Sequence, residues 1–222
     1  MKLKPLIAAL TLATAGLSSA WAAPVLSIVP AQSRVALNGL VTVDIVISGL
    51  TGVNEIVSGF DLNVSFNTGV LSWRTIDLTP ATIALGGSGN VLLAFDADDS
   101  DGKIGGDMTS FLADDDLDAL QGDSFTLMSL QFEGVQNGVS FLDFGADPDF
   151  ERLVTGRLEA SGIAGVLNLQ YTGACVAVGT GSCTQNPIPE PATFGLAGLA
   201  LLGCGLTRSL TRRRQAPTLS TA

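Results

Sequence analysis

Histidine is absent from this 222-residue chain. Without histidine, neither a Ser-His-Asp triad nor a Cys-His pair can form, and the most common zinc ligand is missing. The chain also lacks a G-x-S-x-G elbow, a Walker loop and a G-x-G-x-x-G segment after a strand. Glycoside hydrolysis needs only two carboxylates, so a glycoside hydrolase survives as a remote alternative. The sequence therefore predicts a protein that is not an enzyme.

Positive charge is scarce, with 11 Lys and Arg against 21 Asp and Glu. Six of the basic residues lie near the two ends: Lys2, Lys4, Arg208, Arg212, Arg213 and Arg214. Residues 23–191 therefore keep 11 − 6 = 5 basic residues against 21 acidic ones, a net charge of 5 − 21 = −16. Such a domain repels nucleic acid and anionic lipid, which leaves divalent cations, basic proteins and neutral sugars as ligand classes.

Large aromatic side chains are few, with two tryptophans and one tyrosine. Sugar-binding platforms use exposed Trp or Tyr rings. Trp73 alternates with Leu71, which predicts that it faces the core, and we expect Tyr171 to be partly buried near Cys175. A module that binds carbohydrate, in particular exopolysaccharide, is therefore the alternative rather than the first choice.

The N-terminal apolar run is short. Lys2 and Lys4 precede an apolar stretch at residues 6–17, and Ala20-Trp21-Ala22 supplies an A-x-A cleavage site. This pattern predicts a helical secretory signal peptide at residues 1–23 and an exported protein.

The C-terminal apolar run is also short. Pro189-Glu190-Pro191 is followed by a glycine-rich apolar segment at 192–206 and then by basic residues that include Arg212, Arg213 and Arg214. Fifteen helical residues span about 22 Å, less than the ~30 Å hydrocarbon core of a bilayer. The run suits transient membrane insertion with the arginines on the cytoplasmic side, and an ordinary membrane anchor is the alternative.

This three-part ending resembles the PEP-CTERM sorting signal of Gram-negative bacteria. The resemblance assigns residues 189–214 to the signal, its apolar part to a hydrophobic helix, and residues 215–222 to a disordered tail. It implies recognition by the membrane enzyme exosortase, transient insertion in the inner membrane, and delivery to the cell surface, the outer envelope or the extracellular matrix.

Only three cysteines are present. Seven residues, including two glycines, lie between Cys175 and Cys183, so a disulfide in an oxidising compartment is expected, with two free thiols as the alternative. Cys204 lies in the C-terminal apolar run. Residues 173–188 are interpreted as a cysteine-containing linker.

Alternation with a period of two dominates the middle of the chain. It is clearest in residues 41–47 and 60–66, and further strand-like runs are predicted at 70–73, 91–95, 125–132, 139–144, 153–158 and 166–171. Asn-Gly and similar turn signals separate the runs. Eight or nine short strands predict an all-β, antiparallel sandwich.

Two acidic segments have structural interpretations. Asp114, Asp115 and Asp116 precede an apolar pattern, and this predicts one or two turns of helix at the rim with the acids in its first turn. The acids at Asp143, Asp147, Asp149 and Glu151 flank Pro148 and predict a solvated turn.

Residues 25–47 (VLSIVPAQSRVALNGLVTVDIVI), 59–66 (GFDLNVSF) and 111–132 (FLADDDLDALQGDSFTLMSLQF) resemble the cohesin-like domain found in PEP-CTERM proteins. The resemblance covers residues 24–172. It implies a jelly-roll β-sandwich related to carbohydrate-binding modules. Cohesins bind dockerins through a sheet face, but no local motif here marks the binding residues.

The most chemically suggestive stretch is DADDSDGKIGGD at residues 96–107. Calcium takes six to eight oxygen ligands, which closely spaced carboxylates can supply. Ala97 and Met108 occupy places where an EF-hand loop needs acids, so that type of site is disfavoured. A solvated acidic loop is the first interpretation, and a noncanonical calcium site is the alternative, with these ligands: Asp96, Asp98, Asp99, Asp101 and Asp107.

These observations predict an exported, non-catalytic, cohesin-like module of the cell envelope or extracellular matrix. We expect it to work in adhesion or interaction, with a protein or a polysaccharide as its partner. We expect no cofactor, and calcium is the alternative.

Overall fold

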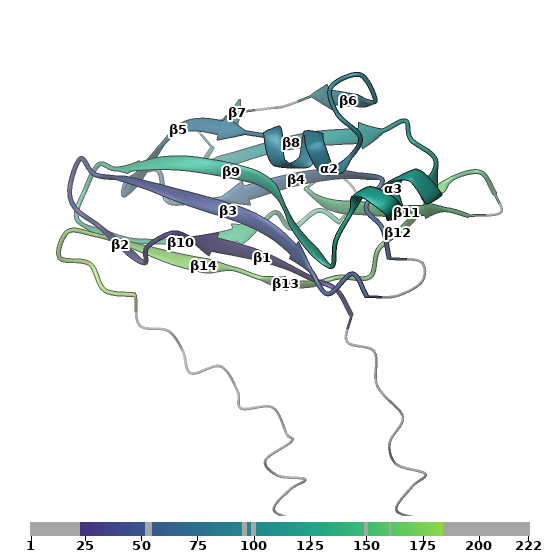
Figure 1. The fold of residues 1–222 in the computed structure, drawn as a ribbon. Coiled ribbons are helices and arrows are strands. Elements are labelled where there is room, and N and C mark those ends of the chain that lie inside the picture. The colour runs from purple at the N-terminus through teal and green to yellow at the C-terminus, as the bar shows by residue number, and fades with distance from the viewer. Residues whose placement is uncertain are drawn as a thin grey trace, which may run out of the picture. The chain divides into compact units, whose positions relative to one another are not determined.

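A computed structural model describes residues 23–51, 55–94, 97–98, 101–148, 151–159 and 161–183 (Figure 1). These residues form two β-sheets and two short helices. The predicted signal peptide, the two predicted terminal helices, the sorting segment and the C-terminal tail lie outside the described residues.

The first sheet has five strands in the order β13-β1-β3-β9-β5. Its strands are β13 (Gln170–Thr172), β1 (Val25–Pro30), β3 (Leu40–Ser48), β9 (Ser124–Gly134) and β5 (Leu71–Asp77). Its outer face mixes polar and aliphatic side chains. The Ser129 hydroxyl donates a hydrogen bond of 2.5 Å to the Asp44 carboxylate, and Val29 and Leu40 are exposed.

The second sheet has nine strands centred on β4. On one side of β4 lie β11 and β10, and on the other lies β8, which also pairs with β6 and β7. The strands are β2 (Arg34–Val35), β4 (Gly59–Ser65), β6 (Val91–Ala94), β7 (Ala97–Asp98), β8 (Lys103–Ser110), β10 (Gly138–Phe144), β11 (Arg152–Leu158), β12 (Ala164–Val166) and β14 (Ala174–Val178).

Almost all strand pairs are antiparallel, and the sheets enclose one hydrophobic core. The exceptions are two parallel pairs, β1 with β13 and β14 with β2. The all-β sandwich predicted from the alternating pattern is confirmed. Every buried core residue lies between Leu26 and Val178, so residues 23–183 contain the complete core of this unit.

The period-two pattern is reproduced in the burial of side chains. In β3, Val41, Val43, Ile45 and Ile47 are at most 1% exposed, while the residues between them are half-buried. In β4, the inward side chains of Phe60, Leu62 and Val64 alternate with Asp61 and Asn63. One face of each strand therefore packs in the core and the other is available for contacts outside the sandwich.

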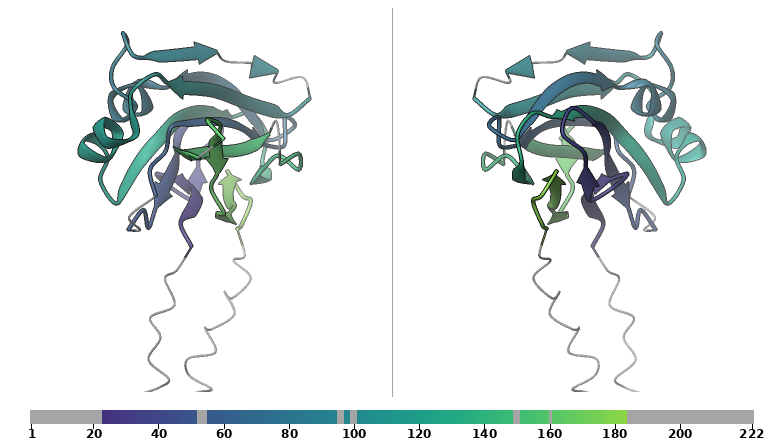
Figure 2. Two further views of the ribbon diagram at one scale, coloured as in Figure 1. Left: turned by 90° about the vertical axis from the view of Figure 1, so that its right-hand side faces the viewer. Right: turned by 90° about the vertical axis from the view of Figure 1, so that its left-hand side faces the viewer.

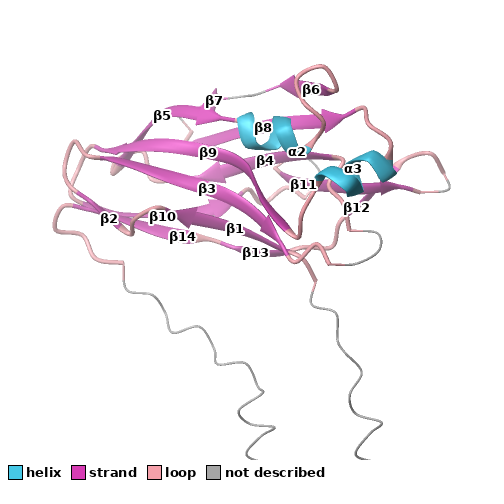
Figure 3. Ribbon diagram, viewed as in Figure 1, coloured by secondary structure: helices cyan, strands magenta, loops and turns pink. Residues whose placement is uncertain are grey.

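Two helices lie in the connections (Figure 3). Helix α3 (Asp114–Leu120) carries Asp114, Asp115 and Asp116 in its first turn, as predicted, and buries Leu117. Helix α2 (Thr79–Ala84) was not predicted, although Pro80 in its first turn is a helix-start signal. The Asp77 carboxylate accepts a hydrogen bond of 2.9 Å from the Thr79 backbone N–H and so satisfies one donor of this helix start.

The predicted linker at residues 173–188 is wrong in its first part. Residues 174–178 form β14, which pairs with β10 and with β2, and Val176 and Val178 are fully buried. The segment was mistaken for a linker because small residues and flanking glycines weaken its strand pattern. The folded unit therefore ends beyond residue 172, at Cys183 in the described residues.

The predictions for residues 96–107 and 166–171 are also wrong in part. The acidic stretch 96–107 is not a loop throughout, because Lys103 begins β8, which pairs with β4 over seven residues. The run at 166–171 was predicted as one strand, but β12 ends at Val166 and β13 begins at Gln170. These two short strands belong to different sheets.

Candidate interaction face

The outer face of the second sheet is the most distinctive surface of the described chain. It is formed by β6, β8, β4 and β11, with β12 at one edge (Figure 1). Register places one residue from each strand in a row across the face: Val166, Thr155, Gly59, Thr109 and Leu92. We call this the apolar row, because its two ends are exposed aliphatic side chains.

The apolar row is raised at its ends and low in its middle. Val166 is 69% exposed and Leu92 is 61% exposed. Gly59 lies between them with no side chain, and a Cβ atom there would lie 3.0 Å from the Met108 carbonyl oxygen and 3.1 Å from Thr155 Oγ1. The Thr155 hydroxyl also donates to the Gly59 carbonyl at 3.2 Å. The floor is therefore tightly packed, and only the rims project.

Beside the apolar row lies an acidic row. Asp61 of β4 is directly opposite Asp107 of β8, and Leu153 of β11 is opposite Asp61 on the other side. Burial raises the pKa of the Asp61 carboxyl above its usual value, and the negative charges of Asp107 and Glu151 raise it further. Like charges directly opposite one another on neighbouring strands destabilise a sheet. A cationic group from outside would relieve that repulsion.

Asn63, Gly105 and Lys103 occupy the next outward positions along β4 and β8. Asn63 is opposite Gly105, where a Cβ atom would lie 1.6 Å from Asn63 Oδ1, so the Asn63 side chain covers the glycine. Lys103 forms an ion pair with Glu151, and this hydrogen bond lowers the pKa of Glu151 and raises that of Lys103. The single lysine of the face is therefore already engaged.

The predicted acidic turn is present. Glu151 accepts a hydrogen bond of 3.1 Å from the Asp147 backbone N–H, and its own N–H donates to the Asp147 carbonyl at 3.0 Å. Asp143 accepts a hydrogen bond from the Phe144 N–H. Asp149 lies outside the described residues. The described members of this cluster thus serve turn formation and the ion pair with Lys103.

The structure separates two of the predicted calcium ligands, Asp98 and Asp107. Ala94 pairs with Asp107, whereas Asp98 pairs with Lys103. Four residues of strand, about 13 Å, therefore separate Asp107 from Asp98, too far for these two residues to ligate the same calcium ion. The structure does not test a calcium site that Asp107 shares with Asp96. Asp96 and Asp99 lie outside the described residues, and nothing is described of the Asp98 side chain.

No group of three or more potential metal-ligating residues occurs within the described part of the chain. Calcium binding by some or all of the predicted ligands stays a prediction: Asp96, Asp98, Asp99, Asp101 and Asp107. Calorimetric titration of residues 23–188 with calcium tests it. An absence of both heat and a thermal shift at millimolar calcium would dismiss the site.

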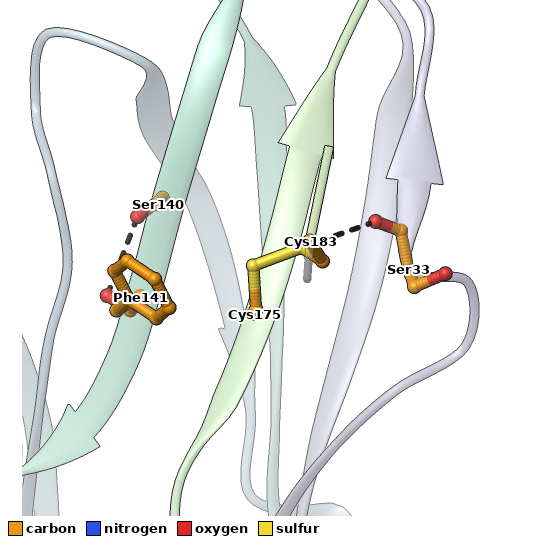
Figure 4. The surroundings of a disulfide bond; sticks show 5 residues. All are labelled: Ser33, Ser140, Phe141, Cys175 and Cys183. Atoms are coloured by element: carbon orange, nitrogen blue, oxygen red, sulfur yellow. Dashed lines mark hydrogen bonds between the residues drawn. A yellow bond between two sulfur atoms is a disulfide. The ribbon is translucent and has the colours of Figure 1, made fainter. Parts of the chain in front are cut away.

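The far end of the same sheet carries the two cysteines (Figure 4). Cys175 Sγ and Cys183 Sγ are 2.01 Å apart, the length of a disulfide bond. Phe141 of β10 is the register partner of Cys175 and is 70% exposed. Cys183 also contacts the Ser33 carbonyl at 3.8 Å, so the bond holds the end of the folded chain beside β14 and β2.

Neither large aromatic side chain forms an open sugar platform. Trp73 packs against the core, as predicted. Tyr171 is 37% exposed, its hydroxyl donates to the Arg152 carbonyl at 2.9 Å, the Arg152 guanidinium lies 5.4 Å from its ring centroid, and Phe144 contacts its edge. Burial raises the pKa of Tyr171. Its ring is thus in contact with Arg152 and Phe144.

Residues 187–214 match the PEP-CTERM protein-sorting motif. This match includes Pro189, Glu190, Pro191, Arg212, Arg213 and Arg214. The motif implies export and sorting at the membrane in Gram-negative bacteria, with processing by exosortase. None of the helices in the described residues is long and apolar enough to span a bilayer. Among curated proteins, none matches the chain in sequence.

The fold is that of cohesin domains. A type II cohesin from the cellulosome of Acetivibrio cellulolyticus superposes with a TM-score of 0.54 and 18% identity, covering 70% of this chain and 95% of that one. A type II cohesin from a cohesin–X-dockerin complex of the same organism has a TM-score of 0.53 and 10% identity, covering 70% and 99%. A type II cohesin dyad from its adaptor scaffoldin has a TM-score of 0.51 and 15% identity, covering 68% and 47%.

Proposed function

We propose that residues 23–183 form a non-catalytic interaction module that binds a partner protein through the outer face of β6, β8, β4 and β11. The observation that carries this proposal is the apolar row beside the acidic row. Protein interfaces combine a few apolar anchors with a polar rim, and Leu92, Val166 and the Asp61–Asp107 pair offer that combination on one surface.

The charge of the face favours a basic partner. Asp61 and Asp107 lie side by side, and Lys103 is already paired with Glu151. A lysine or arginine of the partner would lower the pKa of Asp61 and remove the repulsion between the two carboxylates. A cohesin with a similar fold comes from a complex with an X-dockerin, which supports a protein as the partner class.

The carbohydrate-binding alternative has less support on this face. Its described residues include neither tryptophan nor tyrosine. Exposed aromatic faces are what sugar rings stack on. The glycoside hydrolase alternative requires glycan turnover that is lost when Asp61 or Asp107 is replaced by its amide.

We further propose that the sorting motif delivers this module to the cell surface or the extracellular matrix. The apolar run would enter the inner membrane transiently, with Arg212, Arg213 and Arg214 on the cytoplasmic side, until exosortase acts. Fractionation of cells with and without exosortase tests this step. A mature protein that keeps its tail and its location in both strains would contradict it.

Binding through the face is tested with residues 23–188, which include the complete core. Thr109→Arg adds bulk and positive charge at the centre of the apolar row, and Thr75→Arg makes the same change at an exposed strand position on the other sheet. We expect envelope and matrix fractions from the source cells to retain the Thr75→Arg variant as they retain the unmodified chain, and to lose the Thr109→Arg variant by at least tenfold.

Two controls identify the partner class. Protease treatment of the fractions should abolish retention if the partner is a protein. If retention persists after protease treatment and purified exopolysaccharide competes with it, the module binds carbohydrate instead of a protein. Equal retention of the Thr109→Arg and Thr75→Arg variants would rule out this face as the binding surface.

A further inference from the structure

Strand β6 is an open edge of the second sheet. It pairs with β8 on one side, and none of the described strands pairs with it on the other. Figure 1 and both views of Figure 2 place β6 and β7 at the margin of the sheet, with no described segment beyond them. An open edge carries backbone N–H and C=O groups that can pair with a further strand.

The backbone groups at this edge can be assigned from the pairing with β8. The Phe111 N–H donates to the Asn90 carbonyl at 2.8 Å, just before the first residue of β6. Hydrogen-bonded and non-hydrogen-bonded positions alternate along an antiparallel pair, so Leu92 also bonds to β8. The N–H and C=O groups of Val91 and Leu93 therefore point away from β8, toward the open side.

The edge exposes a leucine on each of its two faces. Leu92 lies opposite Thr109 on the outer face of the sheet and is 61% exposed. Leu93 lies opposite the fully buried Met108 on the core side, yet it is 49% exposed, so the sandwich does not close over it. Successive side chains of an added strand would therefore meet Leu92 on one face and Leu93 on the other.

The other edge strands of the described sheets have features that discourage strand addition. Strand β5 has a register shift at Arg74 and ends in Asp77, and β2, β12 and β13 have only two or three residues each. Charged residues, bulges and short strands are the usual means of protecting an edge. Residues 91–94 have no charge, no proline and no register shift against β8.

The acidic pair lies next to this edge. Asp107 is the register partner of Ala94, and Asp61 is opposite Asp107 on the other side. A strand added beside β6 would lie two strand spacings, about 10 Å, from Asp107. The long stem of a lysine or arginine opposite Ala94 allows its charge to reach the Asp107 carboxylate. A second copy of β6 has no basic residue to place there, so charge complementarity favours a basic segment of another protein.

We propose that β6 accepts an extended segment of the partner protein as an additional strand, in which a lysine or arginine lies beside two consecutive apolar residues. The basic residue is opposite Ala94 and reaches Asp107. The two apolar residues are opposite Leu93 and Leu92, one on each face, and the backbone pairs with Val91 and Leu93. This inference rests on the protein-binding function proposed above and names the segment of the partner that binds.

The test uses nitrogen-15-labelled residues 23–188 and two synthetic peptides. The probe is Thr-Val-Val-Lys-Val-Val-Thr, which fits in either strand direction, and glutamate replaces the lysine in the control peptide. We expect the probe to shift the NMR signals of the Val91 and Leu93 amides and to slow their hydrogen exchange. The control peptide should bind at least tenfold more weakly, because it places a third negative charge beside Asp61 and Asp107.

Two variants separate backbone pairing from side-chain contact. Leu93→Pro removes an N–H that points away from β8, so it should keep the fold, checked by thermal melting, and abolish binding of the probe. Leu93→Ala keeps that N–H and should weaken binding by less than tenfold. If Leu93→Pro does not fold, hydrogen exchange at Val91 and Leu93 in the unmodified chain decides.

Three results overturn the proposal: absence of binding, shifts confined to other strands, and equal binding of the two peptides. Shifts of the Val91 and Leu93 amides that grow with protein concentration, without peptide, would assign the edge to a second copy and also overturn it. The function proposed above fails separately, through equal retention of the Thr109→Arg and Thr75→Arg variants.

Discussion

Removal of the disulfide gives a prediction with a magnitude that follows from the structure. The perturbation is Cys175→Ser together with Cys183→Ser in residues 23–188. The bond closes a loop with a sequence separation of 8. Loop-closure entropy for about eight residues corresponds to about 2.5 kcal/mol at 25 °C. We expect the free energy of unfolding to fall by up to this amount.

Other contacts set how much of that value is realised. Arg34 and Val35 hold Gly179, and the Thr180 N–H donates to Asn137 Oδ1 at 3.3 Å, so part of the loop stays in place without the bond. A loss of about 1.5–2.5 kcal/mol is therefore expected, or about 4–7 °C in the melting temperature of a domain of about 160 residues.

The assay is urea unfolding followed by circular dichroism, with Ser182→Ala as a control inside the same loop. The control should unfold at the midpoint of the unmodified chain, and the double variant at a lower midpoint that reductant does not change. Reductant should shift the unmodified chain to the midpoint of the double variant. The reasoning is refuted if the double variant matches the unmodified chain under oxidising conditions.

Three further predictions concern single residues. Gly105→Ala should lower stability by about 1–3 kcal/mol in urea unfolding, since a Cβ there would lie 2.4 Å from the Leu62 carbonyl oxygen, whereas Gly89→Ala, with open space around it, should not. Asp61→Asn should raise the melting temperature at pH 7 by about 1–3 °C, because it removes one of two opposed carboxylates. The pKa of Asp61 is raised in the folded protein, so ionised Asp61 lowers stability increasingly as pH rises through that pKa. Near pH 3, where Asp61 is protonated, the increase in melting temperature of the Asp61→Asn variant should vanish. Asp77→Ala should cost about 1 kcal/mol at pH 7, because Asp77 accepts hydrogen bonds from Thr79 that lower its pKa. That stabilisation is present above the unfolded-state pKa of 3.8 and is lost as pH falls through the lower folded-state pKa. A difference in unfolding free energy between Asp77→Ala and the unmodified chain that stays constant down to pH 2 would contradict this explanation.

Strands could be predicted from the sequence where apolar and polar residues alternate regularly and the apolar ones are buried in the core. Strands β3 and β4 satisfy this condition, and α3 follows from acids placed before Leu117. Strand β8 does not satisfy it, because Gly105 and Gly106 interrupt its pattern. Gly105 is suited to its place only because Asn63 of the neighbouring strand lies over it. Pairing of that kind depends on tertiary structure and leaves no local signal.

The interaction face was beyond sequence reasoning for a related reason. Alternation indicates that Asp61 points away from the core, but it does not indicate that Asp107 lies opposite it. The apolar row combines residues that are up to 107 positions apart, since it joins Gly59 to Val166. Register between strands is fixed by packing across the whole sheet, so the row appears only in the folded chain.

The contacts of the basic residues in the folded unit support the proposal of a basic partner. Residues 23–183 contain five of them, and each has an internal contact: Arg34 with Gly179, Arg74 with Glu133, Lys103 with Glu151, Arg152 with Tyr171, and Arg157 with Asp115 and Asp118. None of these contacts neutralises the Asp61–Asp107 pair. The domain thus has no cation of its own among the described residues to place between these carboxylates. In the proposed complex, a positive charge at that position would come from the partner.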